Sequence, residues 1–192
     1  MEMSTPETII RSGEPFRPLT RAEYHKLGEL GFFEDERVEL LFGLVIPMSP
    51  LDPSHVTSSY LVRRTLEVKL AGRAHVFENV PFAASDISEP QPDILVTPEV
   101  SWKEHATKAI LVVEIARSSI RRDKGPKSLV YGLADVDEYW IVNHVDEVVE
   151  VYRDRHEGEW RTKQTFSRGQ HIAMLAFPDV TLAVDDILPP TP

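Results

Sequence analysis

The chain contains 192 residues, of which 42% are hydrophobic and 27% are charged, values that are ordinary for a soluble globular protein. It has no cysteine, which excludes a disulfide scaffold, a thiolate metal site and a cysteine nucleophile. Its formal net charge of −10 argues against a protein that coats nucleic acid through a basic surface. The sequence shows neither a signal-peptide pattern nor an apolar run long enough to cross a membrane, so we expect a cytoplasmic protein without membrane contact.

The N-terminal part of the chain predicts an irregular arm followed by a short helix. Residues 1–18 contain three prolines and little apolar pattern, which is typical of an arm. The length of the remainder favours one domain over residues 19–192. Thr20 and Glu23 have the spacing of a capping box, so we expect a helix over residues 21–30.

A hairpin and a longer helix are expected next. Residues 37–48 are rich in apolar types around a Phe42-Gly43 turn, which predicts two paired strands. Ser54 is expected to cap a helix over residues 55–71. The inward face of this helix is predicted to carry Val56, Tyr60, Leu61, Leu66 and Leu70.

From residue 74 onwards the apolar pattern favours strands. Strands are predicted over residues 75–82, 94–96, 109–115, 139–142 and 147–152, with a helix over 127–134 and short strands within 159–188. The nearly continuous apolar run of residues 109–115 is typical of a strand that is buried on both faces. Because one helix interrupts the run of strands, we expect an α/β (α+β) fold with a mixed sheet.

Several common catalytic signatures are missing from the sequence. It has no phosphate-binding loop, no glycine-rich dinucleotide motif, no serine nucleophile elbow and no helical zinc motif. The seven histidines do not occur at metal-ligand spacing. Nucleotide hydrolysis by a phosphate-binding loop and ordinary serine-hydrolase chemistry are therefore disfavoured.

Two acidic residues interrupt the apolar strands. Glu114 shares a predicted strand face with Ile110 and Val112, and Asp93 follows Pro92 at the start of a strand. Taken singly, Glu114 can be a charge that reaches solvent at the mouth of a strand, and Asp93 can be a turn residue. Brought together, the two carboxylates would repel each other, and a bound cation would remove that conflict. The pair therefore suggests a metal site more than an acid–base dyad.

A basic segment follows the acidic strand. Residues 117–127 contain five basic residues and one acid, which reverses the sign of the charge of the whole chain. Each base alone is consistent with a solvated loop, whereas the cluster beside an acidic strand end is typical of a surface that faces phosphate. Pro126 suits the first position of a helix, and Lys127 in the first turn can point back toward the strand ends.

The order of these motifs resembles a known family. Pro92-Asp93 followed by Val113-Glu114-Ile115 resembles the signature of the PD-(D/E)XK nuclease superfamily. Over nearly the whole chain, the longer series resembles the Uma-type restriction endonuclease family within that superfamily. The motifs that carry this resemblance are Glu39-Leu-Leu-Phe-Gly43, Met48-Ser-Pro50, His55, Pro90-Gln-Pro-Asp93, Val113-Glu114-Ile115, Asp123 with Lys127 and Tyr131, and Asp137-Glu-Tyr-Trp140-Ile-Val.

The resemblance implies a restriction-endonuclease-like fold, a mixed sheet flanked by helices, and a metal-dependent phosphodiesterase site. Asp93 and Glu114 would be catalytic residues that hold Mg²⁺, with Mn²⁺ as a substitute, and Glu39 would be a further catalytic acid. His55 matches a histidine that opens the long helix and is a candidate accessory residue. The superfamily lysine belongs two residues after the glutamate, where this chain has Ala116.

Lys127 is the candidate replacement for that catalytic lysine. In the family, a lysine on the following helix takes over its place, and here Lys127 would position water or stabilise charge on the phosphate. Arg117 stands where many relatives carry a small residue. We expect Lys127→Ala to slow cleavage, because a positive charge beside the phosphate would be lost. Since a lysine at the start of a helix is rarely buried, the folding stability should change little.

The leading hypothesis is a metal-dependent DNA endonuclease that hydrolyses phosphodiester bonds. Contacts with the DNA backbone are expected from Arg117, Arg121, Arg122 and Lys124, together with Arg63 and Arg64 on the long helix. The alternative is a catalytically inactive binding or assembly protein that kept the nuclease fold, which the charge of −10 and the missing strand lysine both favour. A metal-dependent hydrolase of another small acidic substrate is a third hypothesis.

A homodimer is also predicted. Tyr139, Trp140 and the apolar strands around them offer more hydrophobic surface than one sheet face easily hides. The resemblance points the same way, since members of the family often look dimeric.

Overall fold

The computed structural model describes residues 16–101 and 103–189. The predicted N-terminal arm lies almost entirely outside these ranges. Helix α2 (Arg21–Glu29) follows it, close to the predicted bounds. Its capping box is present, because the Thr20 hydroxyl accepts a hydrogen bond from the Glu23 amide and the Glu23 carboxylate accepts one from the Thr20 amide.

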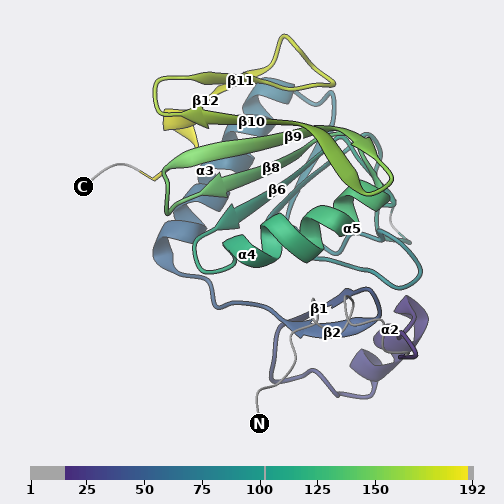
Figure 1. The fold of residues 1–192 in the computed structure, drawn as a ribbon. Helices are drawn as coiled ribbons and strands as arrows, with labels where there is room; N and C mark the ends of the chain where they lie inside the picture. The colour runs from purple at the N-terminus through teal and green to yellow at the C-terminus, as the bar shows by residue number, and fades with distance from the viewer. Residues whose placement is uncertain (1–15, 102, 190–192) are drawn as a thin grey trace.

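Six strands form the central sheet, in the order β10-β9-β8-β6-β4-β3. They are β3 (His75–Glu78), β4 (Ile94–Thr97), β6 (Leu111–Ala116), β8 (Tyr139–Asn143), β9 (Val148–His156) and β10 (Glu159–Ser167). The β6–β8 pair is parallel, and the other neighbouring pairs are antiparallel. This mixed sheet, with helices on both sides in Figure 1, confirms the predicted α/β (α+β) fold class.

Helix α3 (Pro53–Leu70) covers one face of the sheet and lies behind it in Figure 1. Asp52 caps this helix, rather than the predicted Ser54. The apolar core on this face combines Val62, Leu66 and Leu70 of α3 with alternate residues of β6 and with the hairpin of β11 (His171–Ala173) and β12 (Thr181–Ala183).

The predicted inward face of α3 is partly wrong. Val56 and Tyr60 are 51% and 47% exposed, although their apolar character suggested burial. Ser58 is buried in their place, because its hydroxyl oxygen finds a partner 2.8 Å away in His144 Nε2. A polar side chain satisfied in this way can face the interior, and the apolar periodicity alone does not reveal it.

A helical segment between β6 and β8 covers the opposite face of the sheet. It consists of α4 (Ile120–Arg122), the π-helical turn η1 (Asp123–Lys127) and α5 (Ser128–Leu133), and so begins well before the predicted helix of residues 127–134. Pro126 lies inside η1 and not at the first position of a helix. Since proline has no N–H and its ring crowds the carbonyl one turn back, it widens the turn, and the Ser128 amide donates to Asp123 O five residues back.

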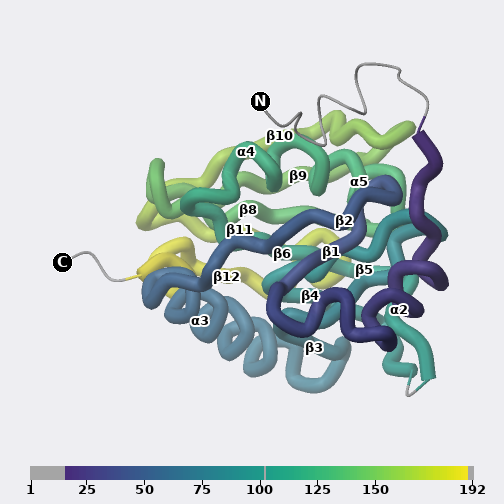
Figure 2. The backbone as a smooth tube through the Cα atoms, turned by 90° about the horizontal axis from the view of Figure 1, so that it is seen from below, coloured from purple at the N-terminus to yellow at the C-terminus, as the bar shows by residue number. Residues whose placement is uncertain are grey.

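The predicted hairpin consists of β1 (Val38–Leu41) and β2 (Leu44–Pro47). Both residues of the Phe42-Gly43 turn have positive φ, 52° and 76°, as the tightest hairpin turns require. Seen from below in Figure 2, the hairpin crosses under β6 and β4. It is attached to the segment before β4, since the Glu89 amide donates to Leu40 O at 2.7 Å. The hairpin and the α4–α5 segment therefore lie on the same side of the sheet.

Three shorter elements complete the described fold. β5 (Lys108–Ala109) and β7 (Asp135–Val136) form a short parallel pair, and η2 (Val184–Asp186) is a single helical turn near the C-terminus. β10 spans nine residues, longer than the short strands expected in this part of the chain. Among the described residues, no helix is both long and apolar enough to cross a bilayer.

The Glu138-Tyr139-Trp140 part of the family motif has a structural role here. Glu138 is fully buried, and its Oε1 accepts hydrogen bonds from Trp140 Nε1 at 2.8 Å and Arg153 Nε at 2.7 Å. Its Oε2 accepts a third bond from the Leu175 amide at 2.8 Å. This buried carboxylate thus ties β8, β9 and the loop after β11 together.

The observation behind the predicted homodimer does not hold. Tyr139 and Trp140 are both fully buried inside one chain, packed in the cores on opposite faces of the sheet. They therefore leave no apolar surface that a second copy would need to cover. The dimer itself stays a prediction.

Candidate active site

The register between β4 and β6 places Asp93 opposite Glu114. In this antiparallel pair Ile94 faces Val113 and Leu95 faces Val112, so the next residue on each strand falls on the same side of the sheet. Both carboxylates are buried on the face that carries α4, η1 and α5. The expected juxtaposition of the two acids is therefore a direct result of strand pairing.

Asp93 is held at both of its carboxylate oxygens. Oδ2 accepts a hydrogen bond of 2.7 Å from the Ile115 amide, and Oδ1 lies 2.9 Å from Nε2 of His55. His55 comes from the first turn of α3, so the candidate accessory residue reaches the same site. Burial lowers the pKa of His55, but the hydrogen bond and the negative charge of Asp93 outweigh it and raise the pKa above its usual value.

Lys127 is enclosed between two carboxylates. Its Nζ lies 2.9 Å from Glu114 Oε1 and 3.1 Å from Glu39 Oε2, and the residue is only 4% exposed. Burial lowers the pKa of Lys127, yet the charges of Glu114 and Glu39 raise it well above its usual value, so the amine stays protonated. The lysine therefore occupies the predicted site, but as a buried cation and not as an exposed residue at a helix start.

Two further residues of the site escaped the sequence analysis. Asp123 is 1% exposed and accepts a hydrogen bond of 2.6 Å from the Ser119 hydroxyl. Burial raises the pKa of this carboxyl to about 6, although Lys127 opposes the shift. Tyr131 donates a hydrogen bond of 2.6 Å to Glu114 Oε1. Asp123, Lys127 and Tyr131 are four residues apart in the motif, a spacing that indicates one shared helix face.

All of these side chains except that of Tyr131 line one small pocket. It has about 50 Å³ of free space, which is enough for a few water molecules or a cation but not for a nucleotide. Five acidic residues line it, Glu39, Asp52, Asp93, Glu114 and Asp123, together with His55, Lys127, Arg117 and Arg122. When all are ionised, five carboxylates face three permanent cations, so the pocket carries an excess of negative charge.

The pocket fits a hard divalent cation. Glu39 Oε1 is buried and has no hydrogen-bond partner among the described residues, with Arg122 Nη1 at 3.9 Å as a nearby positive group, so this oxygen is free to accept a closer cation. The donors are carboxylate oxygens, the type that Mg²⁺ and Mn²⁺ prefer. Asp93 and Glu114 would be the ligands, with Glu39 as an additional one.

The predicted nucleic-acid-binding residues differ in their distance from the pocket. Arg117 and Arg122 line it, and Arg117 is 64% exposed. Arg121 is exposed but does not line it, and Lys124 forms an ion pair of 2.7 Å with Glu150. Arg63 pairs with acidic residues of α3 and β3 and does not reach the pocket.

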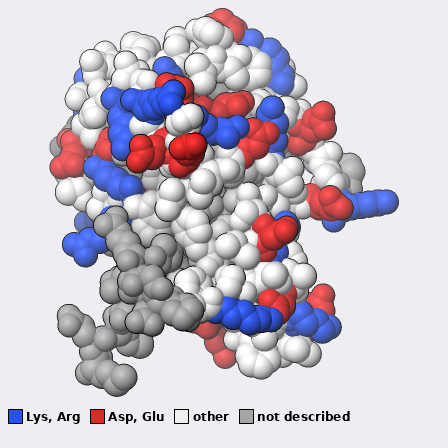
Figure 3. Space-filling view, turned by 45° about the vertical axis from the view of Figure 1, so that its right-hand side comes forward, with Lys and Arg blue, Asp and Glu red and all other residues white. Residues whose placement is uncertain are grey.

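Basic and acidic side chains are mixed on the surface. On the face in Figure 3, Lys and Arg side chains lie beside Asp and Glu side chains in most places, and no broad basic area is visible there. This agrees with the net charge of −10. This face offers no broad basic surface to a polyanion, and the basic groups at the pocket, Arg117 and Arg122, are local ones.

The fold and the sequence both have relatives. The crystal structure of a protein from Anabaena variabilis, described as a putative nuclease belonging to DUF820, has a TM-score of 0.69 to this chain at 16% identity, and the match covers 88% of this chain and 97% of the other. No curated protein matches the sequence. Residues 21–185 match the Uma2 family, whose description is "Putative restriction endonuclease". This match spans most of the chain, which therefore belongs to the Uma2 family.

Proposed function

We propose that the protein is a divalent-metal-dependent DNA endonuclease. The observation that carries this proposal is the convergence of Asp93, Glu114 and Lys127 on one pocket with an excess of negative charge. The descriptions of the Uma2 family and of the DUF820 structure support nuclease chemistry for this fold. The assignment of individual catalytic residues rests on the geometry described above.

Asp93, Glu114 and Glu39 would hold Mg²⁺, or Mn²⁺ as a substitute. When bound, such an ion polarises a phosphate oxygen and lowers the pKa of a water molecule. The contribution of the protein is to hold the carboxylates in place before the ion arrives. Strand pairing does this for Asp93 and Glu114, and the Gln91 amide, 3.2 Å from Glu39 Oε2, does it for Glu39.

Lys127 serves as an electrostatic partner of the phosphate. Because the neighbouring carboxylates keep its amine protonated, it is not suited to accept a proton from water. Its positive charge instead offsets negative charge that develops on the phosphate in the transition state. Glu114 and Glu39 hold the ammonium group at the edge of the pocket, which removes the need to order it when substrate binds.

Arg117 and Arg122 are the residues that we expect to contact the DNA backbone first. Both line the pocket, and the guanidinium group of Arg122 is anchored by a hydrogen bond of 3.0 Å to Pro47 O. Arg121 and Lys124 extend this basic segment away from the pocket. With so few phosphate contacts, the affinity for DNA should be modest and should fall with salt concentration.

Cleavage of supercoiled plasmid tests the proposal directly. The full chain is incubated with plasmid and Mg²⁺ or Mn²⁺, beside a sample with chelator, and Glu114→Gln is measured in parallel. Asp179→Asn is a suitable control, because Asp179 is a surface residue paired with Arg73 outside the pocket. We expect metal-dependent nicking by the chain and the control but not by Glu114→Gln. Binding of DNA without cleavage under either metal would favour the catalytically inactive alternative.

A further inference from the structure

A second cluster of metal-ligating groups lies apart from the nuclease pocket. His25 comes from α2, Glu89 from the segment before β4, and His105 from the loop between β4 and β5. One ligand atom of each residue lies within 4.8 Å of the other two. None of the three lines the pocket of Asp93 and Glu114. The three residues lie far apart along the chain, so the spacing of the histidines does not indicate this cluster.

The geometry of the cluster is already close to that of a three-ligand site. His25 Nε2 lies 2.6 Å from Glu89 Oε1, and the rings of His25 and His105 are 6.0 Å apart at an angle of 76°. In a tetrahedral zinc site the ligand atoms are roughly 3.4 Å apart, as follows from bonds of about 2.1 Å. Small rotations of two exposed histidine side chains would therefore open room for an ion between them.

We propose that His25, Glu89 and His105 bind a transition-metal ion of the Zn²⁺ type. Two imidazoles and one carboxylate form a donor set that suits Zn²⁺ and its neighbours, whereas Mg²⁺ prefers oxygen alone. Water would complete the coordination, because both histidines are exposed. Glu89 would bind through Oε1, since its Oε2 accepts a bond of 2.7 Å from Arg21 Nε.

A simple ion pair explains only part of this arrangement. The contacts of Glu89 with Arg21 and His25 satisfy both of its carboxylate oxygens without a metal. They give no reason for the position of His105, whose side chain makes no hydrogen bond to any other described residue and yet lies at the edge of the His25 ring. A shared ion supplies such a reason.

The proposed ion would connect three parts of the chain that pack around the hairpin. The backbone of Glu89 is paired with that of Leu40, next to the candidate catalytic residue Glu39. An ion at Glu89 would therefore hold α2 and the loop that bears His105 against the strand that carries Glu39. We infer a stabilising role for this site, and the inference does not depend on the proposed nuclease activity.

Metal titration of the full chain tests the proposal without any measurement of cleavage. Excess Mg²⁺ is present throughout to compete for hard oxygen sites, and Glu114→Gln is measured in parallel to identify any Zn²⁺ or Co²⁺ that enters the carboxylate pocket instead. Co²⁺ absorption reports on nitrogen ligation and stoichiometry, and thermal unfolding with Zn²⁺ reports on stabilisation. His105→Ala is the decisive variant, because this exposed side chain can be removed without breaking a hydrogen bond within the described part of the chain.

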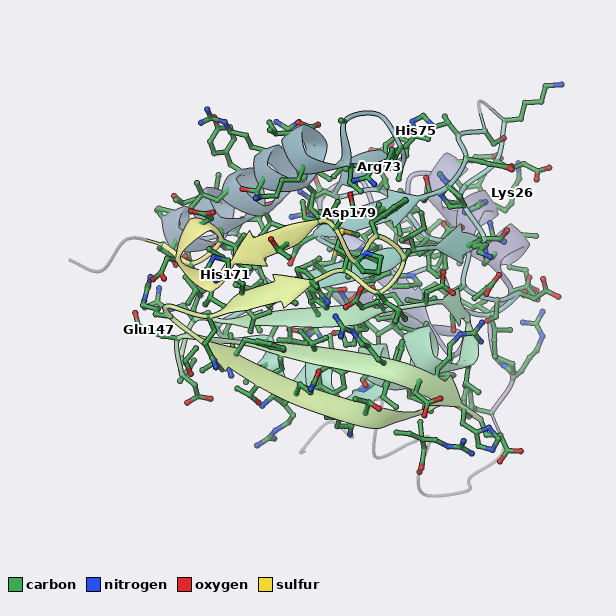
Figure 4. All side chains as sticks on the ribbon, turned by 90° about the horizontal axis from the view of Figure 1, so that it is seen from above. Lys26, Arg73, His75, Glu147, His171 and Asp179 are labelled. Carbon is green, nitrogen blue, oxygen red and sulfur yellow. The ribbon has the colours of Figure 1, made fainter. Side chains whose placement is uncertain are left out.

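His171→Ala is the matched control. His171 is also exposed, and in Figure 4 it lies on the opposite side of the view from Lys26, the α2 residue that follows His25. We expect one Co²⁺ per chain with nitrogen ligands and a rise in the unfolding midpoint of roughly 5–11 °C at a hundredfold excess of Zn²⁺ over its dissociation constant. His105→Ala should weaken binding at least tenfold, and His171→Ala should not change it.

Two results would overturn the proposal. One is an unchanged Co²⁺ spectrum and Zn²⁺ affinity in His105→Ala. The other is a loss of binding in Glu114→Gln while His105→Ala binds normally, which would assign the ion to the nuclease pocket. Either result can be obtained whether or not the protein cleaves DNA, so failure here and failure of the proposed function are separable.

Discussion

The ammonium group of Lys127 lies 2.9 Å from Oε1 of Glu114, although the two residues come from a helical turn and a strand. In the superfamily signature both residues belong to one strand, two positions apart, and this chain has Ala116 there. The helical segment after β6 thus places the Lys127 ammonium group beside Glu114 from outside the sheet. Burial of this ion pair links the chemistry of the site to the stability of the fold.

Lys127→Met should lower both cleavage and stability. We expect the cleavage rate to fall at least tenfold, because a charge partner of the phosphate is lost. The free energy of unfolding should fall by about 3–5 kcal/mol, since Glu39 and Glu114 would lose their shared cation in a buried site. Urea unfolding and plasmid cleavage measure the two effects. This corrects the expectation from sequence that stability would change little, which assumed an exposed lysine.

Two companion variants separate these effects. Lys124→Ala removes a lysine that is 42% exposed, and it should cost less than about 1 kcal/mol. Adding Glu39→Gln to Lys127→Met should recover part of the stability but none of the cleavage. Equal losses in Lys124→Ala and Lys127→Met would show that Lys127 has no special position in the site.

Asp93→Asn and Asp93→Ala should differ in stability but not in activity. Asparagine keeps an oxygen that can accept the bond from the Ile115 amide, whereas alanine leaves that amide without a partner at a cost of about 1–3 kcal/mol. Both variants lose the carboxylate charge, so both should reduce metal-dependent cleavage roughly a hundredfold or more. Chemical unfolding beside cleavage assays checks the pattern. Substantial cleavage by Asp93→Asn would remove this residue from the catalytic set.

The stability of Asp123→Asn, relative to that of the unmodified chain, should increase as the pH rises. The folded-state pKa of about 6 lies above the ordinary value of 3.8, so the folded protein holds this proton more tightly than the unfolded chain does. The resulting stabilisation is complete below the unfolded pKa and is lost as the pH rises through about 6. The variant does not lose this stabilisation. Between pH 4 and pH 7 its free energy of unfolding should therefore rise by about 1–3 kcal/mol relative to that of the unmodified chain.

Urea unfolding at these two pH values, with chelator present, measures the difference for Asp123→Asn. The surface variant Asp179→Asn is the control and should show no comparable gain. A gain that is equal in both variants would mean that the burial of Asp123 is not its cause.

Gly132→Ala should destabilise the protein even though alanine favours helices. A Cβ at this position of α5 would lie 2.4 Å from Gly158 O, in the turn between β9 and β10. Relief of this clash requires a backbone shift that costs about 1–3 kcal/mol, more than the gain of up to about 1 kcal/mol in helix propensity. Gly28→Ala in α2, where the nearest atom would be 4.0 Å away, should instead be neutral or stabilising. Thermal unfolding of both variants decides between the two effects.

The strands and the hairpin were predictable because their residues have local preferences that agree with the fold. β6 reads as a buried strand from its apolar run, and the Phe42-Gly43 turn reads as a hairpin. Which face of α3 turns inward was not predictable, because it depends on the burial of Ser58. Ser58 can be buried because its hydroxyl is hydrogen-bonded to His144, which directly follows β8. The apolar pattern within one helix carries no information about a hydrogen-bond partner from a distant part of the chain.

The same reasoning explains which parts of the site were missed. Asp93 and Glu114 were found because charges inside apolar strands are unusual, and Lys127 was found through the resemblance. Asp123 stands among basic residues and looks like part of a solvated loop. Its burial results from the packing of η1 against the sheet, where Tyr139 donates a hydrogen bond of 3.1 Å to its carbonyl. That contact exists only after the strands have paired.

The π-helical turn that precedes α5 makes the position of the Lys127 ammonium group adjustable by insertion or deletion. A strand residue cannot be shifted by one position without turning its neighbours to the other face of the sheet. In η1, removal of one residue before Lys127 would rotate this side chain around the helix axis and leave β6 untouched. Length changes between Ala116 and Pro126 can therefore disconnect or restore the cation while the carboxylates stay in place. The length of this segment thus bears on whether Lys127 reaches the carboxylates as much as the acids themselves do.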